Sequence, residues 1–394
     1  MFDSGDISFT QNDVSEVLQA AMGDHSALQW LEQALGALVF LLVLIDIFLI
    51  VLYARIGSGI VSNRLTKVIW LLFRFASKPF GRHRGVVLSF CGPIILIFLV
   101  IFWTLTLTCG AALIIHPNLG SSVKSGTGET PTDFITALEA GGGSMSIIGA
   151  SDFSPQSGGF RLLYLFNSLI GMSVVSLTLM YLMQVYNALQ RRNSLGFQTF
   201  LLTGETGDAA EVVAGLGYQG KFSNAYSDLA NWADDMSRVK ESHHFYPVLF
   251  YFRFKESFYS TSQMTLIAFD TVSIIKSALD DEEYAWLKNS TAVTQLRRGA
   301  MMLVKRLTDN FLPKATQNEP EEPDEETLRR WRKRYFAALQ RLREAGIKTV
   351  ADEQAGAEAY IELRREWEHY ITALAPTMAY KMEEIDPAGH PAQE

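Results

Sequence analysis

Three long apolar runs dominate the pattern of hydrophobic and polar positions along the chain. Residues 35–54 contain a single charge, residues 86–115 contain none, and residues 162–186 form a third uncharged run that ends shortly before Arg191 and Arg192. A helix of about twenty residues covers the roughly 30 Å of a bilayer's hydrocarbon core. The pattern therefore predicts three transmembrane helices, at 34–54, 86–115 and 161–187.

The lysines and arginines are distributed unevenly between the segments that flank these runs. Residues 1–33 hold six acids and no Lys or Arg, so they lack the basic start of a signal peptide and are expected to form a free acidic arm. Seven basic residues and no acid fall within 55–87, whereas 116–160 holds Lys124 against four acids. Because basic loops stay on the cytoplasmic side, we expect a plasma (inner) membrane protein with its N-terminus outside and its C-terminal half in the cytoplasm.

Within the basic connection at 55–85, residues 65–80 combine charged and aromatic side chains. Lys67, Arg74 and Lys78 are interspersed with a tryptophan and three phenylalanines. Such a segment is typical of a helix that lies along the inner membrane surface. A voltage sensor is the alternative, but it requires arginines at every third position of a full span, and only Arg64 and Lys67 come close.

The connection after the second run ends in a segment that is unlike an ordinary loop. Thr132 or Asp133 can cap a short helix whose apolar residues begin at Phe134, and this helix is too short to cross a bilayer. The sequence SMSIIGASDFSP follows at 144–155 and leads into the third run. A short helix, a glycine-containing extended strand and an acid, placed between two spans, form the order of a re-entrant pore loop at 132–155. Non-helical backbone is stable at membrane depth only where it lines water or is buried in protein.

At these residues the sequence resembles the potassium-channel superfamily of pore-loop channels. The family's loop reads Thr-x-Thr-Thr-Val-Gly-Tyr-Gly-Asp, and residues 144–152 fall in register with it. The resemblance covers about 86–186 and places Gly171 where the family's inner helix has its hinge glycine. It implies a homotetramer in which four loops surround one pore, with K+, or Na+ as well, as the permeant ion. The selectivity filter that it implies consists of Ser146, Ile147, Ile148, Gly149, Ala150, Ser151 and Asp152.

Several positions depart from the family pattern. Ile147 replaces the threonine that closes the innermost ion site, Ala150 the tyrosine that holds the filter's diameter, and Ser151 the second glycine. The glycines at 141–143 weaken the end of the pore helix by up to about 1 kcal/mol each. We therefore expect a cation preference, from the acidic outer loop and the helix dipole, with weakened selectivity for K+ over Na+. A loop that only caps a three-helix membrane anchor is the alternative explanation.

Polar residues interrupt two of the predicted spans. Asn167, Ser173, Ser176 and Thr178 dilute the third, and such residues either line a wet cavity or form hydrogen bonds between helices. Asp46 lies in the first span, where a charge is costly, so it is a candidate for gating or conduction; hydrogen bonding between packed helices is the alternative.

Beyond residue 187 the composition becomes that of a soluble protein. We expect a helical cytoplasmic domain at 188–312, an acidic linker at 313–325, and a helical hairpin with a tail at 326–394. Apolar spacing predicts helices at 264–279 and 281–312, and a hairpin of amphipathic helices at 328–342 and 360–374 joined by a turn at 344–353. The hairpin helices either pair within one chain or assemble subunits.

Three further motifs in this half have competing interpretations. Residues 215–220 match the Gly-x-Gly-x-x-Gly pattern of a phosphate loop, but a helical pattern precedes them, which favours a helix that ends in glycine. The aromatic segment at 245–259 suits core packing or contact with the membrane face. His243 and His244 have no Cys or acid at ligand spacing, so we interpret them as surface residues and expect no metal site.

The composition excludes several classes of function. The net charge of −8 argues against nucleic-acid binding, and the two cysteines fall in one apolar run, which excludes a disulfide scaffold. The sequence has no Walker loop or catalytic triad, so we expect no enzyme and no cofactor. We interpret the chain as a mostly α membrane protein with three transmembrane helices, a re-entrant pore loop and a helical cytoplasmic domain. Its predicted function is that of a pore-forming channel subunit whose partners are its own copies and the bilayer; the alternative is a non-conducting scaffold or sensor that retains the channel frame.

Overall fold

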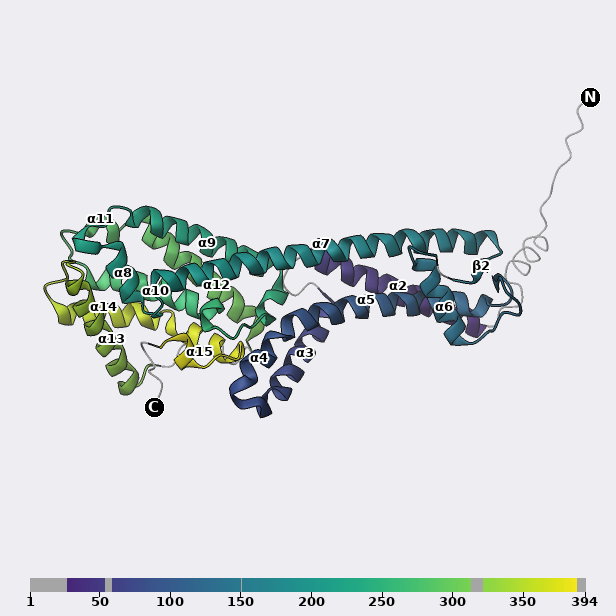
Figure 1. Cartoon of the computed structure of the whole chain (residues 1–394), viewed down its shortest axis with the longest axis horizontal. Helices are drawn as coiled ribbons and strands as arrows, with labels where there is room; N and C mark the ends of the chain where they lie inside the picture. The colour runs from purple at the N-terminus through teal and green to yellow at the C-terminus, as the bar shows by residue number, and fades with distance from the viewer. Residues whose placement is uncertain (1–26, 54–58, 150, 313–321, 388–394) are drawn as a thin grey trace, which may run out of the picture. The chain divides into compact units, whose positions relative to one another are not determined.

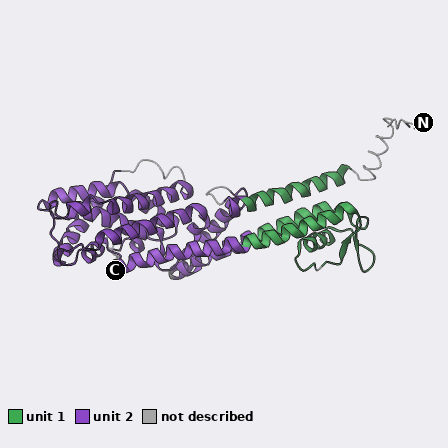
Figure 2. Cartoon of the chain, turned by 90° about the horizontal axis from the view of Figure 1, so that it is seen from above, with its two compact units in different colours: residues 1–48, 100–178 green, residues 49–99, 179–394 purple. Residues whose placement is uncertain are grey.

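A computed structural model of the whole chain describes residues 27–53, 59–149, 151–312 and 322–387. The described chain is mostly helical, as predicted, and divides into two compact units (Figures 1 and 2). The first unit is formed by residues up to 48 together with 100–178, and the second by 49–99 together with 179–394. Most of the predicted N-terminal arm and acidic linker, and Ala150 of the predicted filter, lie outside the described residues.

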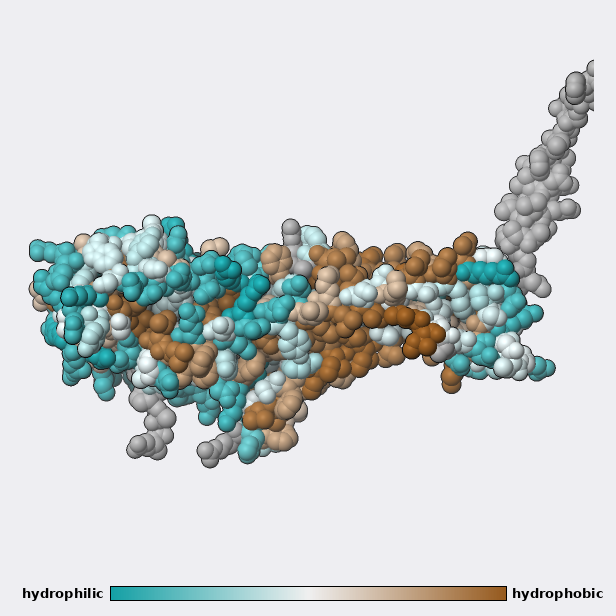
Figure 3. Space-filling model, turned by 45° about the horizontal axis from the view of Figure 1, so that its top comes forward, coloured by the Kyte–Doolittle hydropathy of each residue, from teal (hydrophilic) through white to brown (hydrophobic). Residues whose placement is uncertain are grey.

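Among the described residues, three helices are long and apolar enough to cross a membrane, the number that the sequence predicted. The largest brown area in Figure 3 lies over these helices, whereas the C-terminal helices are mainly teal with a smaller brown patch. The ends differ from the predicted ones: the first helix includes residues 27–33, which were expected to belong to a free arm, and the third continues well beyond residue 187. The elements are α2 (Ala27–Ile47) with the π-helical turn η1 (Phe48–Leu52); α4 (Arg84–Ser89), α5 (Cys91–Ile115) and η3 (His116–Asn118); and α7 (Gly158–Leu202).

The N-terminal part of α2 contacts α5 inside the first unit. Gln33 donates a hydrogen bond from Nε2 to the Ile114 carbonyl oxygen at 3.2 Å. The backbones of the two helices approach closely at Gly36 and Gly110, where a Cβ added to Gly36 would lie 2.8 Å from the Gly110 oxygen. Small residues permit such close packing between apolar helices in a membrane.

The predicted interfacial segment is helical, as α3 (Ser62–Ala76) followed by η2 (Lys78–His83). Ile69 and Trp70 are buried within the second unit, whereas Val68, Leu72 and Phe75 are exposed. α3 therefore has one apolar face packed in the protein and a second one free, as a helix at a membrane surface requires. Its position at that surface stays a prediction.

Several helices of the second unit pack around α10 (Thr261–Ala278), in which Lys276 alone is not buried. α8, α12, α13, α14 and α15 all contact α10, so the predicted hairpin packs on the same core as the helices that precede it. Ser260 caps α10 by accepting a hydrogen bond from the Gln263 amide. The other elements are α8 (Ala209–Leu216), η4 (Tyr218–Gly220), α9 (Ala225–Phe245), η5 (Pro247–Tyr251), η6 (Ser257–Tyr259), α11 (Ala285–Lys288), α12 (Thr291–Phe311), α13 (Glu325–Glu344), α14 (Glu353–Arg365), α15 (Glu368–Thr377) and α16 (Met382–Ile385).

Two predicted helices are interrupted in the structure. The stretch predicted as one helix at 281–312 is divided at Asn289, because Ser290 caps α12 by accepting a hydrogen bond from the Val293 amide. The stretch at 360–374 is divided at Glu366 and Trp367, where the chain turns between α14 and α15. The apolar spacing continues through both breaks, which is why the periodicity did not show them.

The interpretation of His243 as a surface residue was wrong. His243 is fully buried, because it continues the apolar face of α9 that begins with Met236 and Val239. His244, on the neighbouring position, is half-buried. The expectation of a helix ending in glycine at 215–220 is confirmed, since α8 ends with Gly217 at its C-cap.

Candidate pore loop

The short helix expected before the filter is present as α6 (Phe134–Met145). Asp133 caps it: the side chain accepts hydrogen bonds from the Thr136 amide and the Thr136 hydroxyl, each at 2.9 Å. These two bonds hold the pKa of the Asp133 carboxyl below its usual value. A charged cap thus fixes the first turn of a helix that has no charged residue in its last turn.

α6 is packed closely against both neighbouring spans of the first unit. A Cβ added to Gly141 would lie 2.9 Å from the Ala112 backbone nitrogen of α5, and one added to Gly171 would lie 2.1 Å from the Met145 carbonyl oxygen. The structure thus gives Gly141 a packing role, although the sequence suggested only a weakened helix end. It also gives Gly171 a role in close approach; a hinge at this position stays a prediction, and α7 is helical through it.

A buried hydrogen bond joins α6 to α7. The Asn167 amide donates from Nδ2 to Ser144 Oγ at 2.9 Å, and the Ser144 hydroxyl donates to the Gly141 carbonyl oxygen at 2.7 Å. Asn167 is 1% exposed. Of the two roles open to Asn167, the structure shows hydrogen bonding between helices.

The filter segment was expected to be an extended strand, and the structure corrects this. After Ser146 the chain turns, since the Gly149 amide donates to the Ser146 carbonyl oxygen at 3.3 Å and the Ser151 amide donates to the Gly149 carbonyl oxygen at 2.8 Å. Gly149 makes the turn with φ of +64°, a conformation that favours glycine. The side chains of Ile147 and Ile148 are exposed. In the single chain, two filter carbonyls are therefore engaged in local hydrogen bonds.

Asp152 follows this loop and lies directly before a strand of a small sheet. Strand β1 (Val123–Ser125) pairs antiparallel with β2 (Phe153–Pro155). The Asp152 carboxylate accepts hydrogen bonds from Thr127 Oγ1 at 2.5 Å and from Ser125 Oγ at 2.7 Å. Both bonds, that of Thr127 foremost, hold the pKa of Asp152 below its ordinary value. The carboxylate is exposed and charged, as a cation-attracting mouth requires.

The other predicted polar residues of α7 occupy two kinds of position. Ser173 and Ser176 are exposed, and their hydroxyls donate to the carbonyl oxygens of Leu169 and Met172, four residues earlier. Thr178 is buried. Two of the four candidates are thus exposed in the single chain.

Asp46 of the first span has a partner in the second. Trp103 donates a hydrogen bond from Nε1 to Asp46 Oδ2 at 3.2 Å, and both side chains are about 1% exposed. The π-helical turn η1 begins two residues after Asp46. The structure shows the packing role that the sequence had left open for Asp46, and a π-turn beside it is a feature that is frequent at functional sites.

Two further groups of polar residues were not found from the sequence. A groove of about 410 Å³ in the second unit lies between α7 and α9, with Gln184, Asn187 and Arg191 along one wall and Asp234 and Arg238 on the other. The polar residues of α7 recur at three- and four-residue spacing, and this periodicity could have revealed one wall.

Among the described residues, no group of His, Cys, Asp and Glu is arranged to hold a metal ion.

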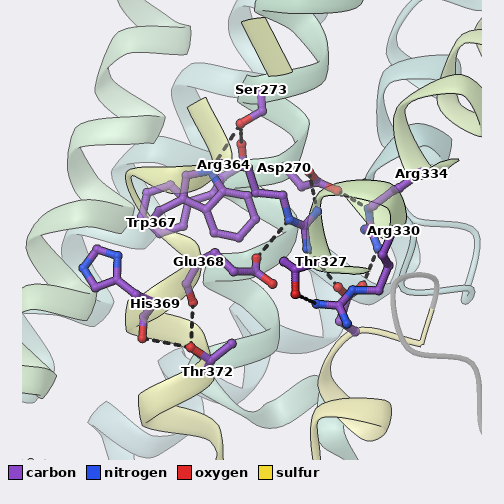
Figure 4. A network of polar contacts seen from close by, with 12 residues as sticks. Asp270, Ser273, Thr327, Arg330, Arg334, Arg364, Trp367, Glu368, His369 and Thr372 are labelled. Atoms are coloured by element: carbon purple, nitrogen blue, oxygen red, sulfur yellow. Dashed lines mark hydrogen bonds and ion pairs between the residues drawn. The ribbon is translucent and has the colours of Figure 1, made fainter. Parts of the chain in front are cut away.

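The second group is a buried ionic network around Asp270 of α10 (Figure 4). Arg334 of α13 donates from Nε to Asp270 Oδ2 at 2.7 Å, and Arg364 of α14 donates from Nη1 to Asp270 Oδ1 at 3.2 Å. Arg364 also pairs with Glu368 and Asp386, both at 3.0 Å. An acid within the apolar sequence TLIAFDTVSII was the available signal for this network.

One similar protein of known sequence is the "Uncharacterized membrane protein YdjJ" of Bacillus subtilis (strain 168). It is 21% identical over 289 residues, which cover 73% of this chain and 81% of that protein. No family model and no solved structure matches the chain. The similarity and the three apolar helices together place the chain among helical membrane proteins.

Proposed function

We propose that the chain is the pore-forming subunit of a tetrameric, potassium-channel-like cation channel, in which α5 and α7 are the outer and inner helices and α6 is the pore helix. Cations pass down their gradient through a filter at 146–152, with weakened preference for K+ over Na+. Residues 188–394 lie in the cytoplasm and assemble or gate the pore.

The observation that carries this proposal is the seating of α6 between two apolar spans. The helix is too short to cross a membrane, its end is fixed to α7 by Asn167 and Gly171, and the chain leaves it through a glycine at positive φ. A surface cap on a membrane anchor needs neither a helix locked between spans nor a charged group anchored after it. The C-terminal end of α6 points its partial negative charge toward the residues that follow, where a cation would be stabilised.

The exposed face of α7 supports a water-filled path beyond the filter. Ser173 and Ser176 are exposed and lie three residues apart in α7, so they share one helical face. When four such faces meet around an axis, these hydroxyl groups provide polar contacts for hydrated ions.

One observation favours the second candidate function, a non-conducting scaffold or sensor. The carbonyl oxygens of Ser146 and Gly149 accept local hydrogen bonds, whereas a conducting filter directs its carbonyl oxygens at the ion. Conduction therefore requires residues 146–151 to open their turn when four chains assemble.

The test is cation flux through the purified chain in liposomes, under a K+ gradient and then a Na+ gradient, with native mass spectrometry to count subunits. Gly149→Ala is the diagnostic variant and Gly158→Ala its matched control. A Cβ meets open space at both positions, but the family resemblance implies that a conducting filter needs backbone dihedrals at position 149 that only glycine adopts readily, whereas Gly158 is helical. We expect four subunits, flux of both ions, and a loss of about tenfold or more in Gly149→Ala. Absence of flux from a tetrameric wild type at every voltage and pH tried would favour the scaffold.

A further inference from the structure

The second unit contains a short aromatic segment that contacts the membrane helices and the C-terminal helices at the same time. Residues 247–254, here called the coupling segment, comprise η5 and the three residues after it. Residues 248–252 are buried. The sequence left open whether this aromatic segment packs in a core or against the membrane side. The structure shows that it contacts the long apolar helices α5 and α7 as well as the C-terminal helices.

On one side the coupling segment fits against the helices that enter the membrane region. Phe252 lies on Gly92 of α5 so closely that an added Cβ would be 2.5 Å from the Phe252 Cγ. The same ring meets Tyr186 of α7 edge to face, with centroids 6.2 Å apart. Phe252 is thus wedged between α5 and α7 at residues 92 and 186.

The neighbours of Phe252 extend these contacts to α3 and α4. The Tyr251 ring meets the Trp70 ring of α3 edge to face, with centroids 5.7 Å apart. The Arg253 guanidinium covers Gly85 of α4, where an added Cβ would lie 2.7 Å from Nη1. Tyr251, Phe252 and Arg253 therefore contact three different helices, α3, α5 and α4, which all precede the pore loop in the sequence.

On its other side the coupling segment is held by polar contacts to α7 and to the C-terminal helices. Arg192 of α7, 1% exposed, donates hydrogen bonds to the carbonyl oxygens of Leu249 at 2.8 Å and Phe252 at 3.0 Å. The Tyr380 hydroxyl accepts from the Phe254 amide at 3.1 Å and donates to the Phe254 carbonyl oxygen at 3.0 Å. The backbone of the segment therefore cannot move without breaking buried hydrogen bonds.

We propose that the coupling segment is the joint through which the C-terminal helices set the separation of α5 and α7 at Gly92 and Tyr186. A shift of the helices around Tyr380 moves the backbone of Phe254, and Phe252 transmits the shift because its ring has no free space against Gly92. Close-packed contacts of this kind shift between discrete arrangements instead of deforming smoothly. The consequence for pore opening rests on the proposed channel function, whereas the mechanical linkage does not.

The linkage is tested on the full-length protein by hydrogen–deuterium exchange in both directions. Gly92→Ala adds a methyl group against the Phe252 ring, and we expect amide exchange in residues 247–254 to rise at least threefold. Gly215→Ala is the matched control, since it is also a helical glycine but its Cβ meets open space. In the reverse direction, Tyr380→Phe removes the hydroxyl that holds Phe254 and is expected to raise exchange in residues 84–92. Tyr218→Phe, at an exposed tyrosine, is its control.

A rescue experiment separates the linkage from general misfolding. Phe252→Ala removes the ring that the added methyl group would strike, so the Gly92→Ala/Phe252→Ala double variant is expected to match Phe252→Ala alone in exchange. Unchanged exchange at 247–254 in Gly92→Ala, or at 84–92 in Tyr380→Phe, overturns the proposal. So does a double variant in which both effects simply add.

Flux measurements on the same variants decide the gating role separately. If the wild type conducts, Gly92→Ala and Tyr380→Phe are expected to change flux at least threefold, and their controls to leave it unchanged. If amide exchange rises in both variants but their ion flux equals that of the wild type, a role in gating is refuted. If the wild type conducts nothing, the channel proposal fails, and transmission of the exchange effects still supports the linkage.

Discussion

Asn167 in the third span and Ser144 in the short pore-loop helix share a buried hydrogen bond of 2.9 Å. The two residues are 23 positions apart, and the bond lies next to the point where Gly171 admits the Met145 carbonyl oxygen. A polar contact and a glycine contact thus fix the same end of α6. The position of the residues that follow, including the candidate filter, is set by this end.

The first prediction concerns that hydrogen bond. Asn167→Leu keeps the volume of the side chain and removes its donor, and the Ser144 hydroxyl keeps its own bond to Gly141. We expect the variant to lose about 1 kcal/mol of unfolding free energy in detergent, within the range for hydrogen bonds between membrane helices. Ser144→Ala should lose a similar amount, and the double variant less than the sum, because both single variants remove the same bond. Ser168→Leu, at an exposed position of α7, is the control; an additive double variant would show that the bond contributes nothing.

The second prediction concerns the charge of Asp152. Hydrogen bonds from Thr127 and Ser125 lower the pKa of its carboxyl, so the charge persists as the outer pH falls and is lost only below the range of an ordinary aspartate, near 3.9. Thr127→Ala removes the larger of the two contributions and should raise the pH at which cation flux declines. Asp152→Asn should lower flux at neutral pH and abolish this pH dependence. The measurement is flux in liposomes against external pH; identical profiles for wild type and Thr127→Ala would contradict the role of Asp152 at the mouth.

The third prediction concerns the ionic network of the C-terminal helices. Arg364 is 1% exposed, and Arg364→Met leaves the carboxylates of Asp270, Glu368 and Asp386 with less compensating charge. Breaking a buried ion pair in this way destabilises by roughly 3–5 kcal/mol. The neighbouring Arg365 pairs with Glu362 in solvent, so Arg365→Met should cost about 0–1 kcal/mol. Chemical unfolding of the two variants checks the difference, and equal losses would mean that Arg364 is not the buried partner of these acids.

Local periodicity predicted the elements of this fold better than it predicted their ends. The uncharged runs gave the three spans, and the amphipathic spacing gave α3, α10 and α13. The breaks at Asn289 and Trp367 were missed because the apolar spacing continues through them. The capping hydroxyl of Ser290 determines the start of α12, and nothing in the hydrophobic pattern distinguishes it from other serines.

Contacts between distant residues were beyond the reach of the sequence. Asp270 and Arg364 lie 94 positions apart, and Gly92 meets Phe252 from the other half of the chain. The sequence identified Asn167 and Asp46 as unusual for their positions but could not choose between helix packing and a role in a wet cavity or in gating, and the family resemblance implied only a hinge at Gly171. That choice depends on which helix lies opposite, and a single sequence does not contain this information.

The last prediction concerns His243, which is fully buried and has no hydrogen-bond partner on either ring nitrogen. Burial, with the nearby charge of Arg192, lowers its pKa from 6.5 to about 3. Below about pH 6.5 the His243 imidazole is protonated in the unfolded chain but stays neutral in the folded chain. The free energy of unfolding therefore decreases as pH falls from about 6.5 toward 3, by up to about 1.4 kcal/mol per pH unit. His243→Leu removes both the titration and the unpaired nitrogens. We expect the variant to unfold later than the wild type at pH 5 and to differ less from it at pH 8. His83→Gln, at an exposed histidine, should follow the wild type at both pH values. A wild type whose stability advantage over His243→Leu grows as the pH falls would show instead that His243 is charged and paired in the folded protein.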